Sequence, residues 1–235
     1  MSDELFFDQF MASSALDAYS VKAFADRLSA YDSDQLVQRS LAFPLAATPL
    51  PSVSTRLDAI AKKRQSSREF GTGTVSAKDL SAVLQSLRAW HGLDHRAYGA
   101  AGSLYAVETF ALTYGVKGMP PQMVYYDAAT HGYVALGAAP DWSAVVETLS
   151  IEVRGVPQVL LLFAVYPERV TVKYGERGGR FALYEVGMAL QQVSLAAAER
   201  GLKGVAVGGV FDEYWRNTLG LDRSAWVSMG YLLGR

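Results

Sequence analysis

The sequence predicts a single domain in which helices and a β-sheet are mixed, and three observations support this prediction. The chain has 235 residues, a length for which one α/β domain is the default and the core needs no disulfide or metal. Between residues 103 and 136, apolar and polar residues alternate between turn signals, as in strands joined by hairpins. The run FALYEVGMALQQVSLAAAERG, at 181–201, shows a long helical pattern that Gly201 ends as a C-cap.

An arm is expected to precede that domain. Residues 1–43 show an amphipathic helical pattern, which the segment FPLAATPLPSVS breaks with its prolines and serines. One helix is expected to begin near Thr55, and another after Ser76 as its N-cap. The core face of the second helix would carry Leu80, Val83, Leu84, Leu87 and Trp90. The sequence therefore predicts an arm and linker at 1–54 and a domain at 55–235.

The rest of the chain alternates between helical and extended patterns. Residues 141–153 look helical, and the following run PQVLLLFAVYP is apolar on both faces, as in a central strand. The helix at 181–201 is apolar nearly all round and should be buried on every side. The last elements expected are a strand (GVAVGG), a helix (DEYWRNTLG) and a strand (AWVSMGYLL).

Composition argues against several classes of partner and location. With 22 basic and 23 acidic side chains, the net charge of -1 gives no field that would attract nucleic acid or an anionic membrane. The chain has no cysteine, which excludes disulfides, iron–sulfur clusters and a thiol nucleophile and fits a reducing compartment. The acidic start MSDELFFDQF lacks the pattern of a signal peptide, and the run VLLLFAV is too short to span a bilayer. We therefore expect a cytoplasmic protein.

The apolar content points to an oligomer. Hydrophobic residues make up 50% of the chain and charged residues 19%, which is apolar for a soluble protein. A subunit interface would bury the additional apolar surface.

A basic segment, KRQSSREF, has the composition of a phosphate site. Arg64 and Arg68 are four residues apart with Ser66 between them, and they would share one face if the preceding helix is just ending. Guanidinium groups offer paired donors to phosphate oxygens. The alternative is a solvated basic helix end, which the helix dipole favours without any ligand.

Two other motifs carry weaker signals. His91 and His95 have the spacing of a metal pair, but they flank a glycine and lack a third ligand, so we expect no metal site. Gly208 and Gly209 follow a strand, and without side chains they would let a flat ligand lie close to the backbone. The alternative is that they only form a turn. The usual hydrolase, P-loop and Rossmann motifs are missing from the sequence.

Four elements in order carry a family resemblance: KRQSSREF, GAAGSLYAVE, KYGERGGRFALYEVG and AVGGVFDEYWRNTLGLD. Over about residues 55–235 the chain resembles the FMN-dependent nitroreductase superfamily and, within it, the SagB-type azoline dehydrogenases. The resemblance implies an α+β fold, with a central, mostly antiparallel sheet flanked by helices, in an interlocked homodimer that binds FMN at the subunit interface. Gly99 and Ala100 replace the family's Pro-Ser, and Ala106 replaces its closing proline, which loosens that loop.

The resemblance also implies which residues bind FMN: Arg64, Gln65, Ser66, Arg68, Ser103, Gly208, Gly209 and Arg235. Arg64 and Ser66 would hold the phosphate and ribityl chain, and Arg235 is a further candidate for the phosphate. Arg68 would face the pyrimidine edge of the ring, where a cation stabilises the reduced flavin. Ser103 would touch the ring, and the glycine pair would lie near its N5 atom.

The pair Lys173-Tyr174 is the catalytic candidate. In heterocycle-forming members of the resembling family, a Lys-Tyr pair precedes the Gly-Glu-Arg turn beside the flavin, whereas many other relatives have Arg-Tyr. The resemblance therefore implies that Lys173 or Tyr174 removes the Cα proton of a thiazoline or oxazoline while hydride passes to FMN. The plainer alternative for Lys173 is a solvated strand end.

The expected function is thus an FMN-dependent azoline oxidase of natural-product biosynthesis, with molecular oxygen as electron acceptor. The substrate would be a peptide or carrier-protein-bound azoline, delivered by a heterocyclase or nonribosomal peptide synthetase partner. Two alternatives stay open: an NAD(P)H-dependent nitro or quinone reductase, and a non-catalytic scaffold subunit of a synthetase complex.

Overall fold

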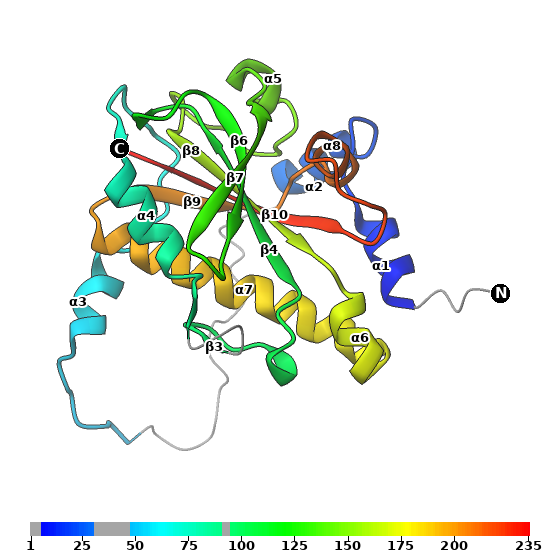
Figure 1. The fold of residues 1–235 in the computed structure, drawn as a ribbon, viewed down its shortest axis with the longest axis horizontal. Coiled ribbons are helices and arrows are strands. Elements are labelled where there is room, and N and C mark those ends of the chain that lie inside the picture. Colours follow the sequence, from blue (N-terminus) through cyan, green and yellow to red (C-terminus); the bar gives the residue numbers. More distant parts are fainter. Residues whose placement is uncertain (1–5, 31–47, 91–94) are drawn as a thin grey trace.

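The computed structural model describes residues 6–30, 48–90 and 95–235. Its centre is a six-stranded sheet in the order β7-β6-β4-β8-β10-β9, in which every neighbouring pair is antiparallel (Figure 1). Its strands are β4 (Val107–Thr113), β6 (Gln122–Asp127), β7 (Gly132–Ala138), β8 (Val159–Val165), β9 (Lys203–Val207) and β10 (Trp226–Gly234). Short pairs form outside it from β1 (Val75–Ser76), β2 (Ala89–Trp90), β3 (His95–Arg96) and β5 (Val116–Lys117).

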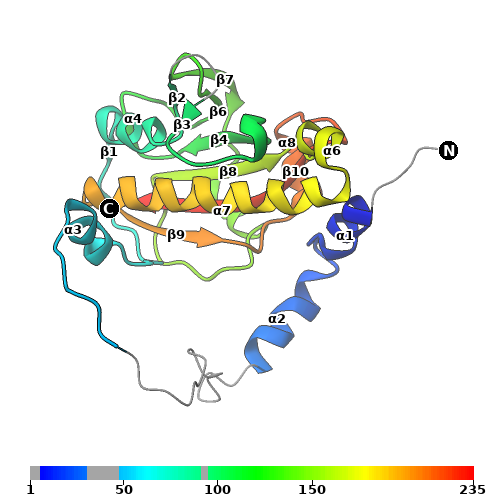
Figure 2. The same cartoon turned by 90° about the horizontal axis from the view of Figure 1, so that it is seen from below.

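Helices cover this sheet and extend beyond it (Figure 2). They are α1 (Phe6–Ser14), α2 (Val21–Ala30), α3 (Arg56–Lys63), α4 (Ala77–Gln85), α5 (Trp142–Val146), α6 (Glu168–Tyr174), α7 (Glu176–Glu199), α8 (Asp212–Thr218) and a 3-10 turn, η1 (Ala101–Ser103). The α+β prediction is confirmed. The α/β default is wrong, because neighbouring strands in the sheet run in opposite directions. Within the described ranges, no helix is both long and apolar enough to cross a bilayer.

The predicted central strand is β8, and it forms the middle of the core. All seven of its residues are buried, and it pairs with β4 on one side and β10 on the other. A strand covered on both faces can be apolar throughout, which explains the unbroken run VLLLFAV.

The charged stretch before the long helix is itself mostly helical, which corrects two expectations. Residues 168–174 form α6, so Lys173 is not at a strand end, and α7 begins at Glu176 rather than at 181. Gly175 joins the two helices with φ 55°, a left-handed conformation that suits glycine. A Cβ on Gly178 would lie 2.8 Å from the backbone of Thr171, so only glycine lets α6 pack this closely on α7.

The C-terminal end of α7 agrees with prediction. Gly201 has φ 65°, and its N–H bonds to the Ala198 carbonyl while the Leu202 N–H bonds to the Ala197 carbonyl. This pair of bonds is the Schellman motif, which satisfies carbonyls that the helix leaves open.

The prediction that α7 is buried on every side is wrong for the single chain. One face packs on the sheet through small residues, but the opposite face is open: Tyr184 is 58% exposed and Met188 is 39% exposed. The exposed residues recur every three or four positions, as Arg177, Arg180, Tyr184, Gly187, Met188 and Gln191. This set is the α7 stripe.

Several predicted helices are shorter than their patterns suggested. In the arm, residues 15–20 separate α1 from α2, and the prediction for 1–5 and 31–43 lies outside the described residues. The helix expected at 141–153 spans only Trp142–Val146. Ser76 caps α4 as predicted, but that helix ends at Gln85, so Trp90 lies in β2.

The described part of the arm is bound to the domain at two points. The Glu176 carboxylate accepts hydrogen bonds from the N–H groups of Phe6 and Phe7, at 2.7 and 3.1 Å. The Phe7 ring fills the space where a side chain on Gly179 would lie. Further along, the Leu16 N–H donates to the Asp212 carboxylate at 3.1 Å, and burial raises the pKa of Asp212 to about 6.

This raised pKa makes stability depend on pH. Because folded Asp212 binds its proton more tightly than the unfolded chain, ionising it between about pH 4 and pH 6 should lower the free energy of unfolding by about 1 to 3 kcal/mol. The variant Asp212→Asn cannot ionise but keeps an acceptor for Leu16. Thermal melts of both proteins from pH 4 to pH 7 should show the variant gaining on the wild type as pH rises. Parallel curves would contradict this assignment.

Candidate active site

The basic segment after α3 is extended and lies beside β9. Arg64 ends the helix with φ -64° and ψ 114°, Ser66 forms a parallel bridge with Gly204, and the Ser67 N–H donates to the Gly204 carbonyl at 3.0 Å. In an extended segment alternate residues point to the same side. Arg64, Ser66 and Arg68 therefore share one side, as expected, but through strand geometry instead of a helix end.

Alternation places Gln65 on the other side of this segment, where it is exposed. Arg64 is half-buried and Arg68 is exposed, and among the described residues neither guanidinium is paired with a carboxylate. Burial raises the pKa of Tyr231 to about 12, while the Arg64 charge acts in the opposite direction, so this cation lies close to the phenol. Two unpaired guanidiniums with a hydroxyl between them suit a phosphate.

Arg235, the third predicted phosphate ligand, is held in a network at the C-terminal end of α7. Its Nε donates to the Thr74 carbonyl at 3.0 Å, and its Nη2 donates to Asp79 at 3.0 Å. Asp79 also accepts two bonds from Arg200, at 2.8 and 2.7 Å. The hydrogen bond from the Ser76 hydroxyl is the main cause that lowers the pKa of Asp79, and the bonds from Arg200 are the second cause. With two arginines on one carboxylate, this network carries a net positive charge.

The two predicted glycines at the end of β9 differ in what surrounds them. A Cβ on Gly209 would lie 2.5 Å from the Ser150 Cβ, so this glycine is required by packing within the chain. A Cβ on Gly208 would meet nothing closer than the end of Met229, at 3.9 Å. Gly208 therefore leaves open space beside the strand, which a flat ligand could use.

Lys173 and Tyr174 converge on the loop that contains Ser103. A Cβ on Gly102 would lie 2.8 Å from the Tyr174 hydroxyl and 2.9 Å from Lys173 Nζ, so both end groups sit against this glycine. Lys173 Nζ is 5.2 Å from the centre of the Tyr174 ring, which meets Phe181 edge-on at 5.2 Å. Ser103 is exposed beside them. The structure thus brings an amine and a phenol together against this loop.

The catalytic pair and the basic residues form two groups at opposite ends of α7. Lys173 and Tyr174 directly precede its N-terminus, whereas Arg235 is bound to Arg200 through Asp79 at its C-terminal end. A helix of 24 residues is about 36 Å long. Figure 2 shows α6 and α3 near opposite ends of the helix. One chain therefore keeps the catalytic pair apart from the phosphate-type site.

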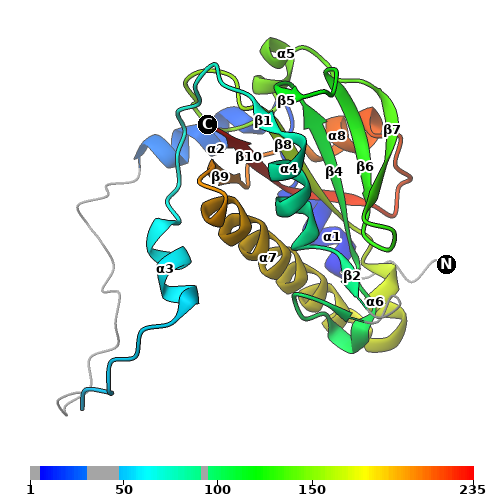
Figure 3. The same cartoon turned by 60° about the vertical axis from the view of Figure 1, so that its left-hand side comes forward.

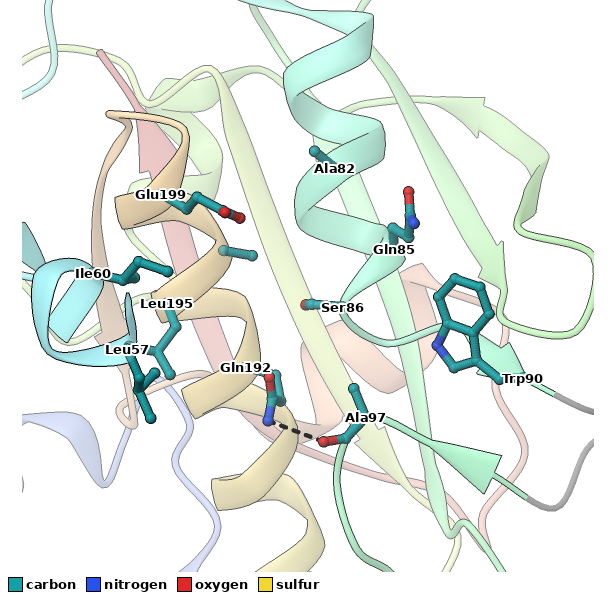
Figure 4. A pocket seen from close by; sticks show the side chains of 11 residues that line it. Leu57, Ile60, Ala82, Gln85, Ser86, Trp90, Ala97, Gln192, Leu195 and Glu199 are labelled. Atoms are coloured by element: carbon teal, nitrogen blue, oxygen red, sulfur yellow. Dashed lines mark hydrogen bonds between the residues drawn. The ribbon is translucent and has the colours of Figure 1, made fainter. Parts of the chain in front are cut away.

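A pocket that the sequence did not indicate lies between α3, α4 and the C-terminal half of α7 (Figure 4). Figure 3 shows how these three helices are arranged. It has a volume of about 440 Å³, with Leu57 on one wall and Trp90 on the other. The Gln192 amide lies at its edge and donates to the Ala97 carbonyl at 3.1 Å. Apolar walls with a few amide groups are typical of sites for small ligands or peptides.

A buried acid was also missed. Glu185 is 1% exposed, and its carboxylate accepts hydrogen bonds from the N–H groups of Ala106 and Val107 at 3.0 and 3.1 Å. Its signal in the sequence is a single acid within the apolar run FALYEVGMAL. The histidine pair remains open, because His91 lies outside the described residues, and within those residues no cluster of metal-ligating side chains forms.

Known proteins share this fold. A chain of the Escherichia coli microcin synthetase McbBCD complex, solved with truncated pro-MccB17 bound, aligns with a TM-score of 0.69 at 19% identity, covering 100% of this chain and 99% of that one. A candidate nitroreductase of Ralstonia eutropha aligns with a TM-score of 0.63 at 18% identity, over 80% of this chain and 87% of the other.

Similarity in sequence leads to the same family. MJ1384 of Methanocaldococcus jannaschii, named as a candidate nitroreductase, is 29% identical over 175 residues, which are 72% of this chain and 87% of that protein. The profile of the Nitroreductase family matches residues 61–235, from the basic segment to the last strand. With that match over most of its length, the chain belongs to the nitroreductase family.

Proposed function

We propose that this protein is an FMN-dependent oxidase that converts peptide thiazoline or oxazoline rings to thiazoles or oxazoles. Members of the nitroreductase family are generally oxidoreductases and typically bind FMN. The observation that carries the finer assignment is the convergence of Lys173 Nζ and the Tyr174 hydroxyl on Gly102. The fold match to a chain of a synthetase complex with bound pro-MccB17 adds support for a peptide substrate.

The residues present fit FMN. Arg64, Ser66 and Arg68 offer a hydroxyl and two cations on one side of an extended segment, and neither cation pairs with a carboxylate of the described residues. Gly208 leaves open space at the end of the adjacent strand. We assign the phosphate and ribityl chain to Arg64 and Ser66, with Arg235 nearby, and the ring edge to Arg68. When bound, FMN supplies a hydride acceptor that molecular oxygen can reoxidise. In this assignment Gln65 and Gly209 contribute to the FMN site through their backbone.

A homodimer would unite the two groups. Two α7 helices packed antiparallel along the α7 stripe would place the Lys173-Tyr174 pair of one chain near the basic segment of the other. Gly187 lies at the middle of the 24-residue helix, and a Cβ there would meet nothing within 4 Å in its own chain. A mid-helix glycine costs about 1 kcal/mol relative to alanine. Close packing of a second helix against Gly187 would explain why glycine stands at this position.

The catalytic pair has a defined task in this proposal. Aromatising an azoline removes one proton and one hydride from the ring, and a carbon-bound proton needs a base within hydrogen-bond reach. Lys173 or Tyr174 takes that proton. Ser103, exposed and next to Gly102 in the chain, touches the flavin ring in this proposal.

The substrate's source is part of the proposal. A heterocyclase or a nonribosomal peptide synthetase would deliver the azoline in the cytoplasm, as a peptide or bound to a carrier protein. The second candidate function is an NAD(P)H-dependent nitro or quinone reductase, which the name of the Methanocaldococcus relative favours. A non-catalytic scaffold subunit is a third, and absence of flavin would support it.

Purified protein should be yellow and hold one non-covalent FMN per chain. The variant Arg64→Leu should bind FMN about 10- to 100-fold more weakly, because it loses charge-assisted hydrogen bonds to the phosphate. Arg154→Leu is the control, since this arginine is exposed and pairs with Glu69 instead. Flavin absorbance and titration of the apoprotein measure both. Protein that stays colourless and takes up no added FMN would support the scaffold function.

Light scattering should give a mass of twice the 25.5 kDa chain. The variant Gly187→Leu should be monomeric and at least as stable within the chain, because leucine favours helix and its side chain begins in open space. Lys78→Leu, on the exposed side of α4, controls for a new apolar surface and should stay dimeric. A wild-type monomer that holds FMN fully would disprove the shared site.

Lys173→Ala and Tyr174→Phe should each reduce azoline oxidation by about 10² to 10⁴, the usual effect of removing a general base. FMN content and melting temperature should stay nearly unchanged, since both side chains end at the loop surface. Val172→Ala is the control, because the neighbouring valine is 86% exposed. Wild-type turnover in both variants would make the pair bystanders. Rapid anaerobic bleaching of the flavin by NADPH would instead favour the reductase.

A further inference from the structure

The loop beneath the catalytic pair has an unusual backbone. Gly102, Ser103 and Tyr105 all have positive φ, at 61°, 56° and 43°. Serine and tyrosine rarely adopt this left-handed conformation, and it persists only where surrounding contacts enforce it. Three charged residues, Arg96, Arg169 and Glu185, hold the end of this loop at residues 105–107.

Two arginines fix Tyr105. Arg169 Nη1 donates to the Tyr105 carbonyl at 2.9 Å. The backbone N–H of Arg96 donates to the Tyr105 hydroxyl at 2.9 Å, and the Arg96 guanidinium lies 4.5 Å from the centre of the Tyr105 ring. Guanidinium groups thus hold the carbonyl and the ring of Tyr105, and a backbone N–H holds its hydroxyl.

Glu185 fixes the two residues that follow. Its carboxylate accepts from the N–H groups of Ala106 and Val107, where the loop enters β4. Burial raises the pKa of Glu185, while the two backbone bonds and the charges of Arg96 and Arg169 favour its ionised form. An apolar side chain could accept neither bond and would leave two buried N–H groups open.

Arg96, Arg169 and Glu185 together are called the clamp. The clamp holds the loop against which the catalytic pair rests. Gly102 is three residues before Tyr105, and its missing side chain leaves the space taken by Lys173 Nζ and the Tyr174 hydroxyl. A shift of the loop would therefore move both end groups together. Displacing a reacting group by about 1 Å can cost about 10²-fold in rate.

We propose that Glu185, Arg96 and Arg169 are positioning residues, which hold the 102–105 loop so that Gly102 sets the places of Lys173 and Tyr174. The inference rests on the proposed function for the role of that pair, but the placement can be tested without turnover. The variant Glu185→Gln keeps the size of the side chain and can accept only one of the two backbone bonds well.

The test reads the position of Lys173 by nuclear magnetic resonance. Lysines of the FMN-bound protein are dimethylated with ¹³C, and the Lys173 signal is assigned with Lys173→Arg. Because its Nζ lies 5.2 Å from the Tyr174 ring centre, the ring current should displace this signal from those of exposed Lys62 and Lys63. In Glu185→Gln the displacement should decrease. Glu199→Gln, the same change at an exposed position of α7, should leave it intact.

Azoline turnover, measured on unmethylated protein, separates this inference from the proposed function. In Glu185→Gln, kcat should fall about 10- to 100-fold with KM nearly unchanged. If the displacement decreases in Glu185→Gln but neither the wild type nor the variant oxidises azolines, the positioning role is supported and the proposed function is rejected. An unchanged signal, or full turnover despite a changed signal, would overturn the positioning role. If Glu185→Gln does not fold, Tyr105→Phe, which removes only the hydroxyl, decides by the same two readouts.

Discussion

The packing of α7 across one face of the antiparallel sheet is the contact on which the other features depend. The helix can lie close because its buried face consists mainly of small residues, among them Gly178, Gly179, Ala182, Ala189 and Ala197. The same face supports α6 at Gly178, the arm at Gly179 and the loop before β4 through Glu185. Every candidate group is attached to this helix or to a strand beside it, so its length and direction decide which groups can meet.

Much of this arrangement follows from the sequence where local and tertiary preferences agree. Ser76 caps α4, Gly201 ends α7 and the run VLLLFAV forms the central strand, because each pattern has one physical solution. The stretch VTVKY is different, because β-branched residues favour extended structure. It is helical here since Pro167 starts the helix and Gly178 allows it to pack on α7.

The candidate site divides in the same way. Residue types indicated Arg64, Ser66 and Arg68, and the family resemblance indicated Lys173 and Tyr174. The structure shows how each subset is brought together. Pattern alone gave no means of distinguishing Gly208 from Gly209, since the difference lies in Ser150, which is distant in sequence. Glu185 was also hidden, because its partners are backbone groups about 80 positions away, and no side-chain motif marks them.

The separation of the two groups along α7 has a genetic consequence. In the proposed dimer each site takes the basic segment from one chain and the catalytic pair from the other. Two chains with different defects, one lacking Arg64 and the other lacking Lys173, would then form a mixed dimer in which one site combines both defects and the other has none. Two inactive alleles could therefore complement each other in a mixed dimer. That dimer would have up to half of the normal activity, because one of its two sites is intact. A protein whose sites each lay within one chain would show no such recovery.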